Sequence, residues 1–307
     1  MSMRSKWIAM CAAGMLVAGA SAARADSSRG GEFRLPGYGA RAWGMAGAVA
    51  ARISDESSVD WNPAGLGRTT RTAGVAYVEL VPESFVTQSQ AVFVTPIGST
   101  FDAETGVWRH AAGAMLTHLS FDLGGGATYT ENYLRVAYAY SPQPVVTFAL
   151  SEGLFFSSSD VPGFDAWGTS ADMAARVSIT KDWSVAGVAR NVYSRYSFQD
   201  GSDEKIDRTW VFALARSNVM GMDLEADFDY LHSGWLRTNL GAETHYIFGV
   251  LALRGGISLI SVGEKRQSYS FGASVRTAGR LFVHYGATVD DTDAFDTVHR
   301  FSLAVTL

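Results

Sequence analysis

Four acidic side chains recur at every second position of one short segment, at Asp223, Glu225, Asp227 and Asp229. Alternate residues of a β-strand point to the same face, so a strand here would carry a stripe of negative charge. Such a stripe could filter ions in a pore. We favour a second interpretation, pairing with arginines and hydrogen bonding to neighbouring chain, because buried like charges require compensation. The predicted charge network comprises Asp223, Glu225, Asp227, Asp229, Arg237, Arg254 and Arg300.

The histidines do not form a recognisable catalytic or metal-binding motif. Six His residues are scattered along the chain, and the sequence contains neither a GxSxG elbow nor an HExxH pair. A lone histidine among charged neighbours is usually a hydrogen-bonded structural residue. The sequence therefore predicts no catalytic residue, no metal site and no cofactor, and we expect a protein that is not an enzyme.

Alternation of apolar and polar residues dominates the chain from residue 71 to residue 307. In its last piece, Phe301, Leu303 and Val305 alternate with Ser302 and Ala304, and this period of two is typical of β-strands. Fourteen such pieces are separated by Gly, Pro, Asp, Asn or Ser. The predicted strands cover residues 72–81, 87–96, 108–120, 128–141, 144–157, 168–180, 183–197, 206–217, 221–232, 235–247, 249–261, 267–277, 280–290 and 297–307.

An even number of strands of this length is typical of an antiparallel barrel in an outer membrane. The connections at one predicted end are short and those at the other are longer and more polar, except that the connection 97–106 is long at the short-turn end. A soluble sandwich would alternate in the same way. Charged residues within the strands favour the barrel, because they would face its lumen. The predicted fold class is all-β, an outer-membrane antiparallel β-barrel of about 14 strands with an N-terminal hatch or plug inside it.

Residues 1–25 have the pattern of a secretory signal peptide. Arg4 and Lys6 precede an apolar run that ends in small residues, with possible cleavage after Ala22 or Ala25. A lipid anchor at Cys11, the single cysteine, is the less favoured alternative. The full chain has a formal net charge of −5, and cleavage after Ala25 would remove Arg4, Lys6 and Arg24 and give −5 − 3 = −8. An acidic exported chain is not expected to bind nucleic acid. We therefore predict export to the outer membrane of a Gram-negative bacterium.

Residues 26–70 do not alternate and form a separate predicted segment. Its small-residue run, residues 40–51, suits a chain threaded through a confined space, although an ordinary periplasmic extension would have the same composition. At its end, Trp61, Asn62, Pro63, Ala64 and Gly65 predict a rigid turn. Asn62 is a good N-cap, Pro63 fits a first helical turn, and Gly65 or Gly67 can end it. We interpret this turn as a structural latch.

Residues 39–48 (GARAWGMAGA), Asp55 and residues 61–66 (WNPAGL) together resemble the entry signature of the outer-membrane fatty-acid transporter (FadL) superfamily, including its shorter PorV-like branch. Residues 240–243, 251–256 and 299–303 are similar to the late strands of that branch. The resemblance implies a fourteen-stranded barrel with a hatch that includes Asn62, Pro63 and Ala64. It also implies capture of hydrophobic compounds outside, and their release through a side opening after the hatch moves.

A transporter of this kind needs an apolar capture patch. The candidate residues, near the outer end of one predicted hairpin, are Leu154, Phe155, Phe156, Phe164 and Trp167. The alternative, which we favour, is an aromatic girdle at the membrane interface. The small residues Val211, Ala213 and Ala215 could hold a ligand or make room for the hatch.

The predicted function is an outer-membrane channel for hydrophobic small molecules such as long-chain fatty acids. The alternative is a PorV-like barrel that acts as a partner or structural component of protein secretion or surface attachment. The expected partners are outer-membrane lipid and either a hydrophobic ligand or an exported protein. The chain divides into a signal peptide (1–25), a hatch or plug segment (26–70) and a barrel (71–307).

Overall fold

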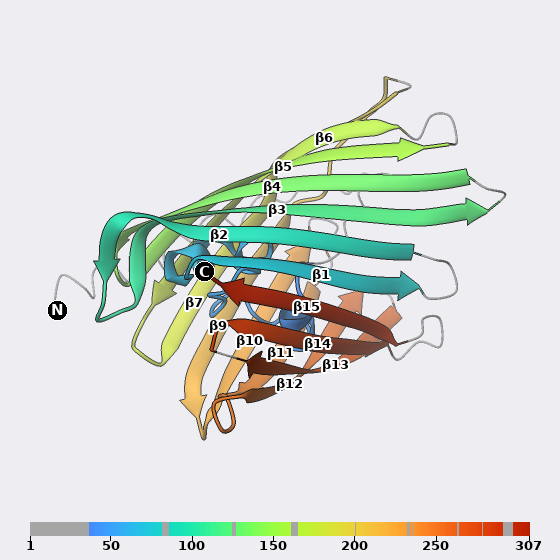
Figure 1. The fold of residues 1–307 in the computed structure, drawn as a ribbon. Coiled ribbons are helices and arrows are strands. Elements are labelled where there is room, and N and C mark those ends of the chain that lie inside the picture. The colour runs from blue at the N-terminus through green and yellow to red at the C-terminus, as the bar shows by residue number, and fades with distance from the viewer. Residues whose placement is uncertain are drawn as a thin grey trace.

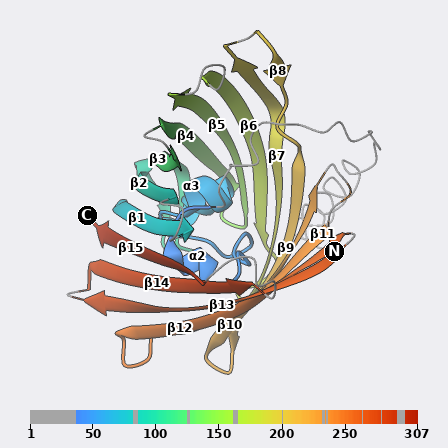
Figure 2. The ribbon, with the colours of Figure 1, turned by 90° about the vertical axis from the view of Figure 1, so that its right-hand side faces the viewer.

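The structure is a computed structural model that describes residues 37–81, 86–124, 127–160, 165–199, 201–231, 234, 236–262, 264–277, 279–290 and 297–307. The predicted signal peptide and residues 26–36 of the predicted hatch lie outside the described residues. The described part of the chain is a single curved sheet that closes on itself, with short helices inside it (Figures 1 and 2).

Fourteen strands form the ring within the described residues, and every neighbouring pair is antiparallel. The ring is closed by the pairing of β1 with β15 and of β6 with β7. Its strands are β1 (Thr72–Val81), β2 (Val86–Asp102), β3 (Val107–Gly124), β4 (Ala127–Gln143), β5 (Val146–Ser159), β6 (Ala166–Ser178), β7 (Trp183–Phe198), β9 (Thr209–Val219), β10 (Met222–Leu231), β11 (Leu236–Thr244), β12 (Leu251–Val262), β13 (Glu264–Thr277), β14 (Leu281–Asp290) and β15 (Val298–Thr306). A further short strand, β8 (Asp203–Glu204), pairs only with the end of β7.

The predicted all-β antiparallel barrel of fourteen strands is confirmed, with one correction to the strands. Strand β1 has the predicted bounds, and the others differ by a few residues at their ends. The connection 97–106, predicted to be long, is mostly strand, since β2 continues to Asp102 and β3 begins at Val107. A register shift between Ile97 and Phe101 allows the hairpin to extend past Gly98, whose φ is 77°. In the sequence, Gly98 is typical of a turn. In the structure it lies at an irregularity of the strand pairing, and the hairpin continues past it.

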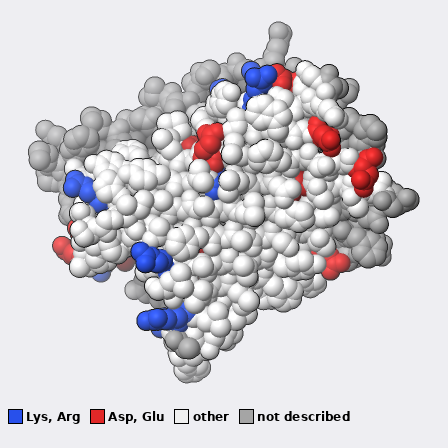
Figure 3. Space-filling model, turned by 45° about the horizontal axis from the view of Figure 1, so that its top comes forward, with Lys and Arg blue, Asp and Glu red and all other residues white. Residues whose placement is uncertain are grey.

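The outer face of the ring is apolar and the inner face is mixed. In β5, buried and exposed residues alternate, and the exposed ones include Phe148, Leu150 and Leu154. On the face seen in Figure 3, charged side chains are few and scattered. Within the part of the chain that the structure describes, no helix is long and apolar enough to span a membrane.

Residues 37–70 lie inside the ring and pack against inward-facing side chains. They contain α2 (Ala40–Trp43), α3 (Ser58–Trp61) and the 3₁₀ helix η1 (Pro63–Arg68). Helix α2 contacts β13, β14 and β15, whereas α3 and η1 contact the opposite wall, mainly β3 and β4 (Figure 2). Of the two possibilities for this segment, threading through a confined space is the one observed for residues 37–70.

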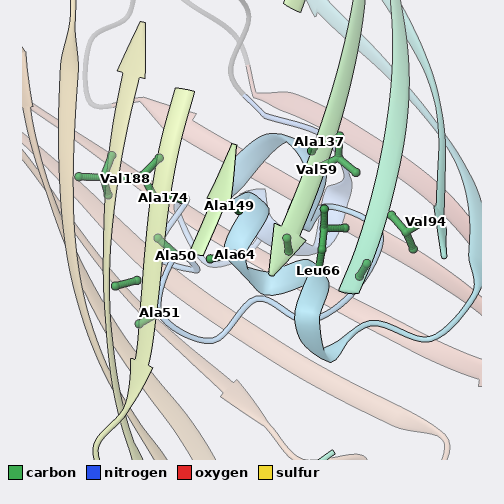
Figure 4. Close-up of a cluster of buried hydrophobic side chains, with 14 of the residues drawn as sticks. Ala50, Ala51, Val59, Ala64, Leu66, Val94, Ala137, Ala149, Ala174 and Val188 are labelled. Carbon is green, nitrogen blue, oxygen red and sulfur yellow. The ribbon is translucent and has the colours of Figure 1, made fainter. Parts of the chain in front are cut away.

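The largest buried apolar cluster joins this segment to the wall. Ala50, Ala51, Ala64 and Leu66 from the segment meet small inward-facing residues of the strands (Figure 4). Small side chains on both sides let the two backbones approach closely. The strand residues of the cluster include Val94, Ala137, Ala149, Ala174, Val188, Val211, Ala213 and Ala215.

Glycines in the wall permit the closest approaches. A Cβ atom at Gly286 of β14 would lie 2.5 Å from the carbonyl oxygen of Ala40, and one at Gly256 of β12 would lie 2.5 Å from the carbonyl carbon of Met45. A side chain at either position would therefore push the segment out of place.

Candidate functional site

The four acidic residues of β10 face inward, and three of them, Asp223, Glu225 and Asp227, hold the segment to the wall. Asp227 accepts hydrogen bonds from the main-chain nitrogens of Val49 and Ala50, each at 3.0 Å. Glu225 accepts one from the main-chain nitrogen of Ala51. These donors lie outside any helix or ladder, so the carboxylates satisfy groups that would otherwise be buried without partners.

The two ends of the acidic stripe use basic partners. Asp223 pairs with Arg52 of the segment at 2.5 Å. Its other carboxylate oxygen lies 3.0 Å from the ring nitrogen Nε2 of His245. At the other end, Asp229 pairs with Arg237 of the neighbouring strand β11 at 2.5 Å. Each acid of the stripe thus has a partner. The arrangement agrees with charge compensation and gives no support to a free ion filter.

The other two predicted arginines lie elsewhere on the wall, but both contact the segment or its partners. Arg254 donates to Glu243 at 2.8 Å, and Glu243 also binds Arg41 of α2. Arg300 lies over the ring of Trp43, with its guanidinium carbon 4.1 Å from the ring centroid. The predicted charge network is therefore two clusters, one on β10 and β11 and one around α2.

The predicted latch joins three parts of the segment. The side-chain oxygen of Asn62 accepts from the nitrogen of Ala64 at 2.9 Å, which caps η1 as expected for an N-cap. Its amide nitrogen donates to the carbonyl oxygen of Ala50 at 2.6 Å, next to the acidic stripe. The ring nitrogen of Trp61 donates to the carbonyl oxygen of Tyr38 at 2.8 Å. Asn62 is fully buried.

Pro63 occupies the first turn of η1, where its missing N–H leaves no bond unmade. Gly65 lies within that helix and does not end it. A Cβ atom at Gly65 would lie 2.5 Å from the carbonyl oxygen of Ile53, so the glycine allows close packing inside the segment. The segment is also tied to the wall here, because Arg190 of β7 donates to the carbonyl oxygen of Trp61 at 2.9 Å.

A further buried ion cluster holds α3 against β4 and β6. Arg135 pairs with Asp172 at 2.5 Å and lies 3.5 Å from Asp60 of α3. Asp60 in turn accepts from the main-chain nitrogen of Tyr38 at 2.9 Å. Arg135 is one of the charged strand residues expected to face the lumen, but the sequence did not identify Asp60 as its partner. Asp60 and Arg135 lie far apart in the sequence, and no periodic pattern relates their positions.

Glu56 is a buried acid in the segment, with only 5% of its surface exposed. Burial, together with the nearby charge of Asp55, raises the pKa of the Glu56 carboxyl to about 8. Burial, then the charge of Glu56, also raises the pKa of the Tyr38 hydroxyl. The segment therefore contains a carboxyl that changes charge near neutral pH.

The predicted capture residues lie on two different faces of the barrel. Leu154, Phe156 and Trp167 point outward and are 40–55% exposed, and Phe156 and Trp167 are cross-strand partners. Phe155 points inward and is 4% exposed. Phe164 lies outside the described residues. The outward three have the position that an aromatic girdle would require.

Phe155 belongs to an inward-facing aromatic cluster that the sequence did not identify. Its ring is stacked on Tyr133, with centroids 4.3 Å apart, and meets Tyr196 edge to face at 6.2 Å. Ala166, Ile206 and Phe198 complete the cluster. The members come from β4 to β7 and from the chain after β8. The only feature of the sequence that could have indicated them is the alternation of inward and outward residues along each strand.

The aromatic cluster is connected to the inner segment. The hydroxyl of Tyr133 accepts a hydrogen bond from Arg135 at 2.5 Å, and Arg135 is the residue that pairs with Asp172 and approaches Asp60. The small wall of Val211, Ala213 and Ala215 has another role, since it packs in the same cluster as Ala50 and Ala51. It makes room for the segment.

Comparison with known proteins gives matches at the level of structure. No family model matches the chain, and no curated protein sequence matches it. Among solved structures, the CymD monoaromatic hydrocarbon channel is similar with a TM-score of 0.69 at 12% identity, covering 88% of this chain and 98% of its own. The toluene transporter TodX of Pseudomonas putida has a TM-score of 0.62 at 12% identity, with 88% and 97% covered.

A FadL homologue from Pseudomonas aeruginosa is similar to the same extent, with a TM-score of 0.62 at 11% identity and 88% and 98% of the two chains covered. In each case nearly the whole of the known channel is matched, so the likeness extends over the complete barrel. The resemblance seen in residues 39–48 and 61–66 is thus confirmed as a likeness of fold. The chain has the fold of the FadL-type channels.

Proposed function

We propose that this protein is an outer-membrane channel for hydrophobic small molecules, and that residues 37–70 act as its hatch. The apolar outer face of the fourteen-stranded ring supports a place in a membrane. The FadL-type fold supports a role in transport, because its solved relatives are named as a hydrocarbon channel and a toluene transporter. The proposed role is transport, without a chemical reaction of the transported compound.

The hatch must move for any compound to pass the lumen. Main-chain hydrogen bonds to Glu225 and Asp227 hold residues 49–51 at the wall, and Asn62 ties them to η1. These contacts are polar and local, so water or an entering ligand can replace them one at a time. We propose that the stretch 49–52 is released first.

The inward-facing aromatic cluster is the observation that carries the ligand assignment. Phe155, Tyr133 and Tyr196 present apolar rings to the inside of the barrel, where a hydrophobic ligand gains most from contact with them. Tyr133 also contacts Arg135, which faces Asp60 of the hatch. A ligand that displaces Tyr133 would thereby disturb the ion cluster that holds α3. Long-chain fatty acids and monoaromatic compounds are the two ligand types to compare.

The test uses adjacent residues that point in opposite directions. We expect Phe155→Ala to reduce uptake of a radiolabelled ligand, oleate or toluene, into cells that express the protein as their only such channel. Phe156→Ala is the matched control, because its ring lies on the outer face. Equal uptake by the two variants, at equal amounts of folded protein in the membrane, would refute the assignment.

The PorV-like alternative predicts another result in the same cells. If the barrel served protein secretion or surface attachment, deleting it would leave uptake of both compounds unchanged and remove exported proteins from the cell surface. Loss of uptake with a normal set of surface proteins supports the channel.

A further inference from the structure

The outer face of β9 to β12 carries an apolar groove lined mainly by outward-facing residues, and the inward-facing Glu225, Gly241 and Gly256 also border it. Its volume is about 580 Å³. The floor is formed by small residues of three adjacent strands, Ala226, Ala242 and Gly255, and the sides include Leu214 and Leu240. Ala242 lies directly beside Gly255 in the ladder. Because these positions have small side chains, the surface is hollow between the leucines that line it.

One end of the groove is positively charged. Arg216 of β9 and Trp183 of β7 both line it, and the guanidinium carbon of Arg216 lies 5.2 Å from the centroid of the Trp183 ring. The two residues are cross-strand partners, which fixes them together at this position. Arg216 is exposed, and among the described residues it forms no ion pair.

This charged end lies near the edge of the barrel. Arg216 is close to the turn that joins β9 to β10, and the nitrogen of the next residue, Ser217, donates to the carbonyl oxygen of Asp182 in the turn before β7. In the proposed membrane placement, on which this inference rests, that depth is the level of the lipid headgroups. The apolar floor then extends toward the hydrocarbon region.

The combination matches one class of molecule. A guanidinium group binds the oxygen atoms of a phosphate, and an aromatic ring beside it suits the interface between headgroup and acyl chain. An apolar groove of small residues fits an acyl chain. We infer that the groove binds one phospholipid, with its phosphate at Arg216 and Trp183 and an acyl chain over Ala226, Ala242 and Gly255.

The test is native mass spectrometry of the full chain, purified in mild detergent and titrated with palmitoyl-oleoyl-phosphatidylglycerol. We expect one retained lipid, and a loss of affinity of roughly tenfold in Arg216→Gln, the effect of removing one charge-assisted contact. Ala242→Leu should also weaken retention, because its side chain fills the floor. Arg276→Gln is the matched control, since Arg276 lies 5.8 Å over Tyr246 at the same end of the barrel and does not line the groove.

Several results would overturn the inference. They are equal retention by wild type, Arg216→Gln and Ala242→Leu, no retained lipid in the wild type, or displacement of the phospholipid by palmitate. Heat-modified mobility in SDS gels checks that each variant is folded. Uptake of hydrophobic ligand should be unchanged in Arg216→Gln, because the groove lies outside the lumen, so failure of this inference is distinct from failure of the proposed channel.

Discussion

Asp227→Ala is the substitution that most directly releases the proposed hatch. Asp227 is 1% exposed and accepts two main-chain hydrogen bonds, from Val49 and Ala50, at 3.0 Å each. Alanine accepts neither, so both nitrogens lose their partner in the closed state. In the open state the same nitrogens bind water in either protein. The substitution therefore destabilises the closed state alone.

The size of the effect follows from the number of bonds. A buried main-chain nitrogen left without a partner costs about 1–3 kcal/mol, so two cost about 2–6 kcal/mol. Water that enters the space left by the carboxylate offsets part of this, and we take a net loss of about 2–3 kcal/mol. Since about 1.4 kcal/mol corresponds to a factor of ten, the open population should rise roughly 30-fold to 140-fold.

Hydrogen–deuterium exchange of the protein in lipid nanodiscs measures this population. The peptide that covers residues 45–52 should exchange faster by that factor in Asp227→Ala, and conductance in planar bilayers should rise with it. Glu152→Ala is the control, because Glu152 is an exposed acid on the outer face of β5. Unchanged exchange of 45–52 in a folded Asp227→Ala barrel would refute the reasoning.

Three further predictions concern the hatch. Asn62→Ala removes the cap of η1 and the bond to Ala50, so it should destabilise residues 62–66 by about 2 kcal/mol, and unchanged exchange there would contradict the latch. Gly256→Val, whose Cβ would meet Met45, should raise conductance, whereas Gly255→Val, whose nearest atom is 3.7 Å away, should not. The pKa of Glu56, raised to about 8 from 4.5, means that the closed form binds a proton more tightly than the released one. Its stability is therefore greatest below the released pKa and falls as pH rises from about 4.5 to 8, by about 1.4 kcal/mol per unit at most. Conductance should rise over that range, and the same rise in Glu56→Gln would count against this origin.

The strands were predictable because each of them has one apolar face. The alternation of Phe301, Leu303 and Val305 with Ser302 and Ala304 is a local signal, and the burial pattern of β15 reproduces it. Val86–Asp102 was the exception, because a glycine and a proline interrupt the alternation and the ladder continues through them with a shifted register.

The sequence was sufficient to predict a capped turn at residues 61–65 and an acidic stripe on one face of a strand. It was not sufficient to predict which residues these two features bind. The sequence identified Asn62 as a cap, because a cap is local, and in the structure the main-chain nitrogen of Ala64 donates to its side-chain oxygen. It did not predict the bond to Ala50, or that Asp227 would bind main-chain nitrogens. Contacts of this kind depend on where a non-repeating segment lies inside the ring, and no period in the sequence encodes that.

The capture residues show the same limit in another form. Leu154, Phe155 and Phe156 are consecutive, and a single patch was predicted from their composition. In a strand, neighbours point to opposite faces, so the three cannot form one surface. Tyr133 and Tyr196 share a face with Phe155, but finding this required the pairing of β4 to β7.

A reversible disulfide between the hatch and the wall tests the central claim most directly. A Cβ atom at Gly241 would lie 3.1 Å from that of Ala48 and 2.9 Å from the carbonyl oxygen of Met45, so the hatch must shift by a few tenths of an ångström to reach the 3.5–4.5 Å of a disulfide. In a protein with Ala48→Cys and Gly241→Cys, and with Cys11 replaced by serine, we predict that ligand flux into proteoliposomes stops on oxidation and returns on reduction. Equal flux in the oxidised and reduced forms, with the disulfide verified by mass spectrometry, would contradict the account.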